Sequence, residues 1–273
     1  MKKVVVFGDS FAGYDWVLKE VGPLHWSTYL GQKLNVPSIN HAVSGSGLNF
    51  TMMRFHQYLI SEEYNKEDIF VFALTNEQRL YSWNMPDPSL GIFYNLLDVV
   101  DLRSRREQQW IKENKDHALW AMEEVLHPSL NYNILKLASF LKVWSQHNIT
   151  NKVIILKCFR SPEEGKKISQ LNKLVTATDN FFPILNETDT LADISSNEFS
   201  SSSLHQYMLS SNAKTPGLDY RVNHISKINR EILSDQLANI ITTQSIASWD
   251  VTKFATHLYK TQEDVDAMNV AFF

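Results

Sequence analysis

Apolar residues gather in short runs near the start of the chain, and each run stops at small or polar residues. The first run, Val4–Phe7, has three β-branched residues among its four and ends at Gly8. An unbroken run of this kind is typical of a strand buried on both faces of a sheet. Two more strands are predicted at Pro37–Val43 and Ile69–Leu74.

Segments with apolar residues at helical spacing alternate with the predicted strands. Because of this alternation, we expect a parallel sheet with helices on both of its faces. A fourth and a fifth strand complete the sheet, and Pro183 indicates that the fifth lies at an edge. The predicted helices are His25–Leu34, Leu48–Ile60, Leu130–His147 and Ser226–Ile241, and the last two strands are Lys152–Phe159 and Asn180–Leu185.

The regions between these elements are less regular. Residues 80–128 are longer than a simple crossover needs, so we expect a helical insertion there, within a single α/β domain of residues 1–247. The remaining predictions are loops at Tyr81–Tyr94 and Asp193–Pro216, helices at Leu96–Val125 and Glu163–Thr178, and a C-terminal tail at 248–273.

Charge and cysteine content narrow the class of protein. The net charge of -4 and the isoelectric point of about 6.1 argue against a surface built to bind nucleic acid. The single cysteine, Cys158, excludes an intrachain disulfide framework, and its apolar neighbours predict a buried thiol. No segment approaches the ~18–20 apolar residues of a membrane span, and we find no signal peptide. We therefore expect a cytoplasmic protein.

Four residues with useful chemistry stand at the ends of predicted elements. Ser10 follows the first strand, Gly45 the second and Asn76 the third. His224 stands just before the last helix, for which Ser226 is a suitable N-cap. Parallel strands end at one edge of a sheet, so the first three residues can converge. A nucleophilic serine needs an imidazole base, and the tetrahedral intermediate needs N–H donors such as these.

No metal or cofactor site is predicted from the motifs. The other histidines lack a metal-ligand spacing such as HxxxH. The segment Gly8–Gly13 lacks the lysine and hydroxyl residue of a phosphate loop, and the chain has no GxSxG elbow. Asp9 is predicted to accept backbone N–H bonds in the turn rather than to act in catalysis.

Short blocks of the chain resemble those of the SGNH (GDSL-type) hydrolases. Gly8–Phe11 resembles the first block, and Asn40–Gly45 is similar to the second, in which an asparagine stands five residues before the glycine. Leu74–Glu77 resembles the third block, usually Gly-x-Asn-Asp, and His224 before a helix resembles the fifth. The resemblance covers residues 3–80 and 217–245.

This resemblance implies a flavodoxin-like, three-layer α/β/α sandwich with a mostly parallel five-stranded sheet. It also implies a metal-free ester hydrolase that uses no cofactor. Carried over by position, Ser10 is the nucleophile and His224 the general base. The backbone N–H groups of Ser10 and Gly45 and the side-chain amide of Asn76 would form the oxyanion hole.

The chain departs from the family pattern in its third and last blocks. Leu74 stands where the family has glycine, and Glu77 where it has aspartate. The family's aspartate three residues before the histidine is replaced by Arg221, and the nearest acid is Asp219. Asp219 is the candidate for orienting His224. A Ser-His dyad and a backbone carbonyl that holds the imidazole remain as alternatives.

Two classes of function follow from these observations. The first is an ester hydrolase that forms an acyl-Ser10 intermediate with a small-molecule or carbohydrate ester, such as an O-acetylated carbohydrate. The second, motivated by the altered blocks, is a catalytically inactive module of the same fold that binds a carbohydrate or a partner protein. A flavodoxin-type binder of a phosphorylated cofactor is a third alternative. The acyl group, the leaving group and the oligomeric state stay open.

Overall fold

The computed structural model describes most of the predicted secondary structure. The described residues are 1–13, 25–43, 46–75, 79–80, 92–93, 130–159, 176–185, 190–204, 225–261 and 263–264. None of the helices within these ranges is both long and apolar enough to cross a membrane.

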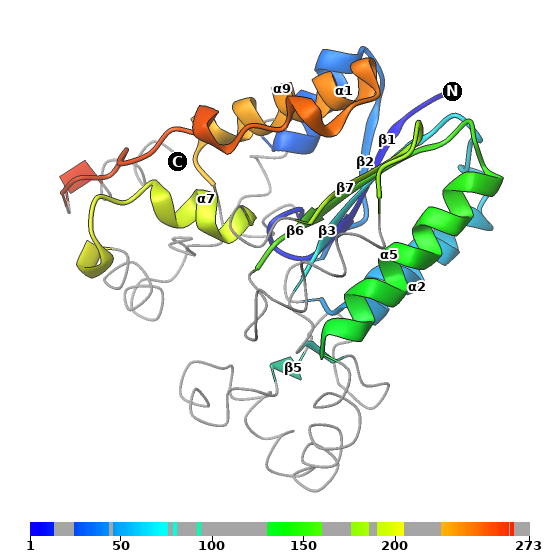
Figure 1. Cartoon of the computed structure of the whole chain (residues 1–273), viewed down its shortest axis with the longest axis horizontal. Coiled ribbons are helices and arrows are strands. Elements are labelled where there is room, and N and C mark those ends of the chain that lie inside the picture. Colours follow the sequence, from blue (N-terminus) through cyan, green and yellow to red (C-terminus); the bar gives the residue numbers. More distant parts are fainter. Residues whose placement is uncertain are drawn as a thin grey trace, which may run out of the picture.

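A five-stranded parallel sheet forms the centre of the molecule (Figure 1). Its order is β2-β1-β3-β6-β7, and every neighbouring pair runs parallel. The prediction of a parallel sheet is thus confirmed, and Pro183 lies in an edge strand as expected. The strands are β1 Val4–Gly8, β2 Ser38–Asn40, β3 Ile69–Leu74, β6 Lys152–Lys157 and β7 Phe181–Ile184.

Helices cover both faces of this sheet, which confirms the three-layer α/β/α arrangement (Figure 1). Helices α1 and α9 lie on one face, and α2 and α5 lie on the other. The described helices are α1 Trp26–Leu34, α2 Leu48–Leu59, α5 Leu130–His147, α7 Leu191–Asn197 and α9 Lys227–Thr243, with short 3-10 turns η4 Ile246–Ser248 and η5 Val251–Lys253.

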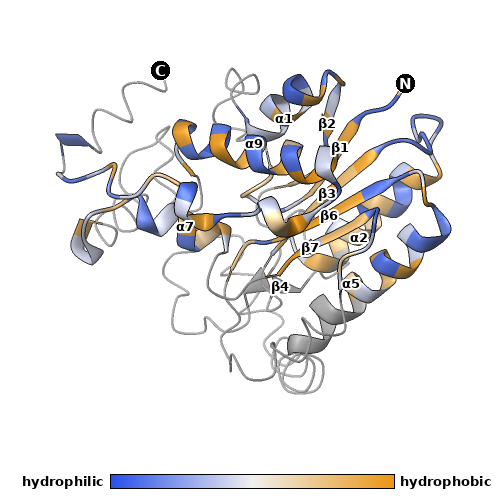
Figure 2. Cartoon of the chain, turned by 45° about the horizontal axis from the view of Figure 1, so that its top comes forward, coloured by the Kyte–Doolittle hydropathy of each residue, from blue (hydrophilic) through white to orange (hydrophobic). Residues whose placement is uncertain are grey.

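Alternate residues of the strands face opposite helical layers, as the period of a strand requires. Val4 and Val6 of β1 pack in the cluster that includes residues of α1 and α9. Val5 and Phe7 pack in the cluster that includes residues of α2 and α5. The central strands β1 and β3 are therefore mostly apolar, whereas the helices carry both apolar and polar residues (Figure 2).

Three of the predicted segments differ from the structure. Asp193–Pro216 was expected to be loop, but it overlaps α7, whose Leu191 and Ile194 are buried. Thr190 and Asp193 form a reciprocal capping box that begins this helix. The helix is too short to show a periodic pattern, so its caps and two apolar residues were the available signals.

The other two differences are also local. The predicted helix that ends at Thr178 does not reach this residue, because Thr178 forms an isolated bridge with Phe181. The predicted loop Tyr81–Tyr94 contains β5 (Ile92–Phe93), which pairs antiparallel with β4 (Arg79–Leu80). A two-residue strand has too few positions for an alternating pattern. The predicted helix Leu96–Val125 lies outside the described residues, as do residues 163–175.

Candidate active site

The chain leaves β1 through a glycine that no larger residue can replace without displacement. Gly8 has a φ of 154°, and a Cβ built on it would lie 2.5 Å from the carbonyl oxygen of Ala73 in β3. Gly8 and Ala73 are also register partners in the sheet. The absence of a side chain at Gly8 therefore lets β1 and β3 approach closely, two residues before Ser10.

The residues after Gly8 form a tight, hydrogen-bonded turn that contains Ser10. The Asp9 carboxylate accepts the N–H of Phe11 at 3.0 Å, and the Asp9 carbonyl accepts those of Ala12 and Gly13 at 3.0 and 2.6 Å. Asp9 and Ser10 are both buried. The prediction that Asp9 accepts backbone bonds in this turn is confirmed.

Three other elements hold the same turn by side-chain hydrogen bonds. The indole Nε1 of Trp26 in α1 donates to the carbonyl of Phe11 at 2.8 Å. The amide of Asn40 in β2 donates to the carbonyl of Ala12. The Cys158 thiol, buried as predicted, donates from the end of β6 to the Asp9 carboxylate at 3.4 Å. The backbone around Ser10 is thus fixed by the scaffold.

The segment after β2 lies beside the same point. The N–H of Val43 and the hydroxyl of Ser46 both donate to the Gly8 carbonyl, each at 3.0 Å. Asn40 also accepts the N–H of Ala42 at 2.9 Å, so one asparagine joins both blocks. Gly45, the residue before Ser46, lies outside the described residues.

The end of β3 reaches the same edge of the sheet. Thr75 follows β3 and is buried, and its hydroxyl has no hydrogen-bond partner among the described residues. A buried hydroxyl of this kind is usually satisfied by water or a ligand. Asn76, the next residue, lies outside the described residues.

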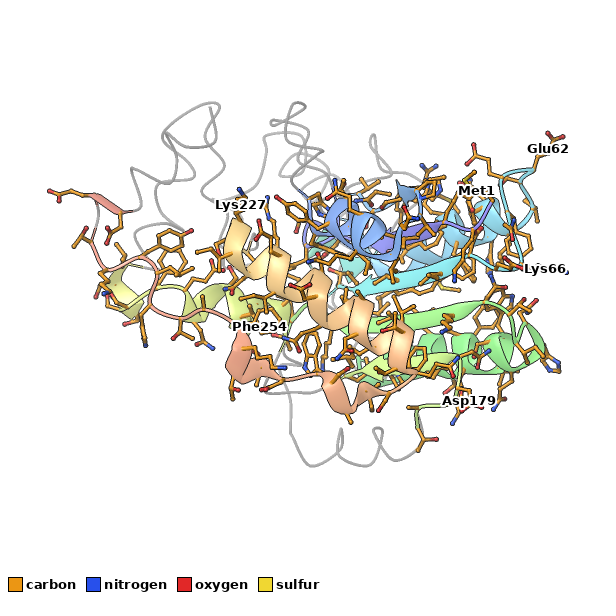
Figure 3. All side chains as sticks on the ribbon, turned by 90° about the horizontal axis from the view of Figure 1, so that it is seen from above. Met1, Glu62, Lys66, Asp179, Lys227 and Phe254 are labelled. Atoms are coloured by element: carbon orange, nitrogen blue, oxygen red, sulfur yellow. The ribbon has the colours of Figure 1, made fainter. Side chains whose placement is uncertain are left out.

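The start of α9 lies at this end of the molecule too. Figure 3 shows Lys227, the first residue of α9, at the opposite end from Met1, Lys66 and Asp179, which stand before β1, β3 and β7. Ser226 caps the helix as predicted, because its side chain accepts the N–H of Asn229 at 3.3 Å.

Two of the predicted site residues precede this helix in the sequence. His224 and Asp219 lie outside the described residues. The structure therefore brings Ser10 together with the chain neighbours of Gly45 and Asn76, and it places the start of α9 at the same end of the sheet.

Glu198, a buried carboxylate at the start of α9, was not among the site residues predicted from the sequence. Its Oε1 accepts the N–H of Ser226 at 2.8 Å and the amide of Asn229 at 2.6 Å, and its Oε2 lies 3.1 Å from the Ser226 nitrogen. Burial raises the pKa of Glu198 to about 7, although these bonds and the Arg230 charge lower it. Glu198 lies within residues 193–216, which were predicted to be a loop. The capping box of α7 was a local sequence signal that a helix begins just before it.

The sheet order makes the edge beside β1 and β3 a natural binding position. The chain passes from β1 to β2 on one side and then to β3 on the other, so the direction of winding reverses between β1 and β3. Ligands of open α/β sheets bind outside the carboxyl ends of the strands at such a point. In the described ranges, no group of three or more His, Cys, Asp or Glu side chains could hold a metal ion.

Comparisons with known proteins give a likeness in structure but none in sequence. No family model matches the chain, and no curated protein matches it in sequence. A solved structure of a carbohydrate esterase, whose active site is described as displaying divergent catalytic and non-catalytic binding functions, is similar at 13% sequence identity. The match covers 91% of this chain and 70% of that chain, with a TM-score of 0.40.

Proposed function

We propose that this chain is a serine ester hydrolase of the SGNH type, with Ser10 as nucleophile and His224 as general base. One observation carries the proposal. The Ser10 turn lies at the point where the sheet order reverses, and Val43 and Ser46, which flank the predicted oxyanion donor Gly45, both bond to Gly8. The packing of β1 on β3 supports a position for Asn76 at the same edge, one residue after Thr75.

The proposed reaction has two steps. The Ser10 hydroxyl attacks the acyl carbon while His224 takes its proton, and the protonated imidazole then gives that proton to the leaving alcohol. A water molecule attacks the acyl-serine, His224 accepts its proton and returns one to Ser10, and the acid leaves. The N–H groups of Ser10 and Gly45 and the Asn76 amide would stabilise the oxyanion in both steps.

Asp219 is the proposed partner of the His224 ring. A carboxylate that accepts the Nδ1–H holds the imidazole in the tautomer that can accept the serine proton. A Ser-His dyad predicts that Asp219→Asn retains nearly full activity. The triad predicts a large loss of kcat in this variant.

The substrate class that we propose is a small-molecule or carbohydrate ester, with O-acetylated sugars as the first class to test. The buried Thr75 hydroxyl, which has no described partner, supports a polar ligand at this edge. Thr75 directly precedes Asn76 in the sequence. A hydroxyl-rich ligand can supply the bond that this group lacks.

Substitution of Ser10 tests the proposal directly. Ser10→Ala should abolish p-nitrophenyl acetate hydrolysis and covalent labelling by a fluorophosphonate probe, with a loss of at least about 10³-fold in kcat. Ser61→Ala is the matched control, because Ser61 lies before β3 at the other end of the sheet. Unchanged turnover in Ser10→Ala contradicts the proposal.

The same experiment separates the enzyme from the inactive binding module. A wild-type protein that shows neither turnover nor labelling, but binds an acetylated sugar by calorimetry, would favour the module.

A further inference from the structure

Three segments of the chain meet at Glu198. Its carboxylate holds the first turn of α9, and its backbone carbonyl accepts the N–H of Tyr259 at 2.9 Å. Asn229, which donates to the carboxylate, also exchanges two hydrogen bonds with the backbone of Ala255, at 3.0 and 2.7 Å. Residues 250–260 are thereby attached to both α7 and α9, and Glu198 stands at the centre of this junction.

The junction is adjacent in sequence to the proposed base. Ile225, the residue after His224, is buried in the core cluster that includes residues of α9. Ser226 follows and is bonded by Glu198. Consecutive Cα atoms lie about 3.8 Å apart, so the Cα of His224 lies within about 7.6 Å of that of Ser226. Whatever holds Ser226 therefore limits where His224 can lie.

We propose that Glu198 is a positioning residue for the general base. Its carboxylate fixes the chain at Ser226, and this sets the position of His224 relative to the rigid Ser10 turn. The inference rests on the proposed function, because it takes His224 as the base. This hold would act on His224 through the chain and would not depend on Asp219, the nearest acid in the sequence.

The charge of Glu198 makes its hold on Ser226 depend on pH. Among the described residues, Arg230 of α9 and Tyr259 of the tail are the titratable groups that act on it. Burial and the Glu198 charge raise the pKa of Tyr259, so this phenol stays neutral near pH 7. Glu198 itself, with a pKa of about 7, gains a proton in mild acid. A protonated carboxyl accepts the Ser226 N–H more weakly, so the hold on the base-bearing segment loosens as the pH falls.

Glu198→Gln, which keeps the shape and removes the charge, tests the proposal. Gln236→Ala is the matched control, because Gln236 clamps Asp250 of the tail by two bonds of 3.0 and 2.6 Å. Gln236 is also buried, but it lies about two helical turns beyond Asn229 along α9 and so further from His224. Glu198→Gln weakens a buried side-chain clamp on α9 and Gln236→Ala removes one, and only Glu198→Gln acts next to the base.

The first readout is the dependence of kcat/KM on pH for p-nitrophenyl acetate. Displacement of a catalytic group by about 1 Å can cost ~100-fold, so Glu198→Gln should lose at least about tenfold. The acid limb of the wild type should be steeper than a single ionisation, since Glu198 and His224 both titrate there, and in Glu198→Gln it should have slope one. Gln236→Ala should stay within about twofold of the wild type with an unchanged profile. An equal loss in both variants, with one profile, overturns the positioning role.

The second readout does not depend on turnover. The His224 imidazole pKa is measured by NMR on histidine-labelled protein, with the resonance assigned from its loss in His224→Gln. A carboxylate nearby stabilises the imidazolium, so Glu198→Gln should lower this pKa by at least about 0.5, and Gln236→Ala should leave it unchanged. An unshifted His224 in Glu198→Gln contradicts the inference. A wild type without turnover but with the shift contradicts the proposed hydrolase while supporting the positioning role.

Discussion

The turn that carries Ser10 and the start of α9 are stabilised in different ways. Side chains from α1, from β2 and from Cys158, the residue after β6, bond to the Ser10 turn, and the turn adds several backbone bonds of its own. The start of α9 is held from outside the helix by the buried carboxylate of Glu198 and by the two bonds between Asn229 and the Ala255 backbone. Among the described residues, bonds from several elements hold the first region, whereas the hold on the Ser226 backbone comes from an ionisable group whose pKa is raised to about 7.

This difference separates the two halves of the proposed catalytic pair. The position of the nucleophile is a property of the sheet, because the turn begins where β1 packs on β3. The position of the base depends on a contact between α7 and α9, two segments far apart in the sequence. Changes in the first region should therefore reduce stability, and changes in the second should alter geometry and pH response.

The largest effect on stability is expected for Gly8→Ala. The added Cβ would lie 2.5 Å from the Ala73 carbonyl, so β1 and β3 must separate. We expect a loss of about 3 kcal/mol or more in the free energy of unfolding, measured by urea denaturation. Fluorophosphonate labelling of Ser10 should fall with it. A stable, fully labelled Gly8→Ala protein would show that the close packing does not place the turn.

The next effect is a pH dependence of stability that comes from Glu198. Its pKa is raised from 4.5 to about 7 in the folded protein. Folding therefore favours the protonated form, and its stabilising contribution is complete below about pH 4.5 and is lost as the pH rises through 7. Relative to Glu198→Gln, the wild type should lose about 3 kcal/mol between pH 4 and 8. Parallel stability curves for the two proteins, measured by urea denaturation, would contradict the raised pKa.

A smaller effect is expected for Trp26→Phe. This variant leaves the buried Phe11 carbonyl without the indole N–H that it accepts at 2.8 Å. The loss should be about 2 kcal/mol in unfolding free energy, with a severalfold slower labelling of Ser10. The pH profile of the remaining activity should keep its wild-type shape, since the base-bearing region is untouched. A changed profile would mean that the two regions are coupled.

Much of the fold could be predicted from local patterns. The runs that became β1, β3 and β6 are buried on both faces, so their residues are apolar or small, apart from the lysines at the two ends of β6, and the signal is strong. The amphipathic pattern of α9 and the capping position of Ser226 were also sufficient. The short elements α7 and β5 were missed, because a few residues cannot show a period.

The candidate site divides in the same way. Ser10 was identifiable because glycine, acid and hydroxyl follow a buried strand directly, and its bonded turn agrees with the role predicted for Asp9. Gly45, Asn76, Asp219 and His224 stay predictions. Glu198 could not be found from its neighbours in the sequence, because the partners of its carboxylate, Ser226 and Asn229, lie 28 and 31 positions away.

The sequence by itself therefore determined the three layers of this protein and the place of Ser10 directly after the first strand. These two features depend on the order of apolar and polar residues over short stretches, which can be seen directly in the sequence. The tertiary structure alone decided that β1 and β3 meet through Gly8, that Asn40 and Trp26 hold the Ser10 turn, and that Glu198 is buried beneath α9. These contacts join residues that only the packing of the layers brings together, and a buried charge gains its shifted pKa only there.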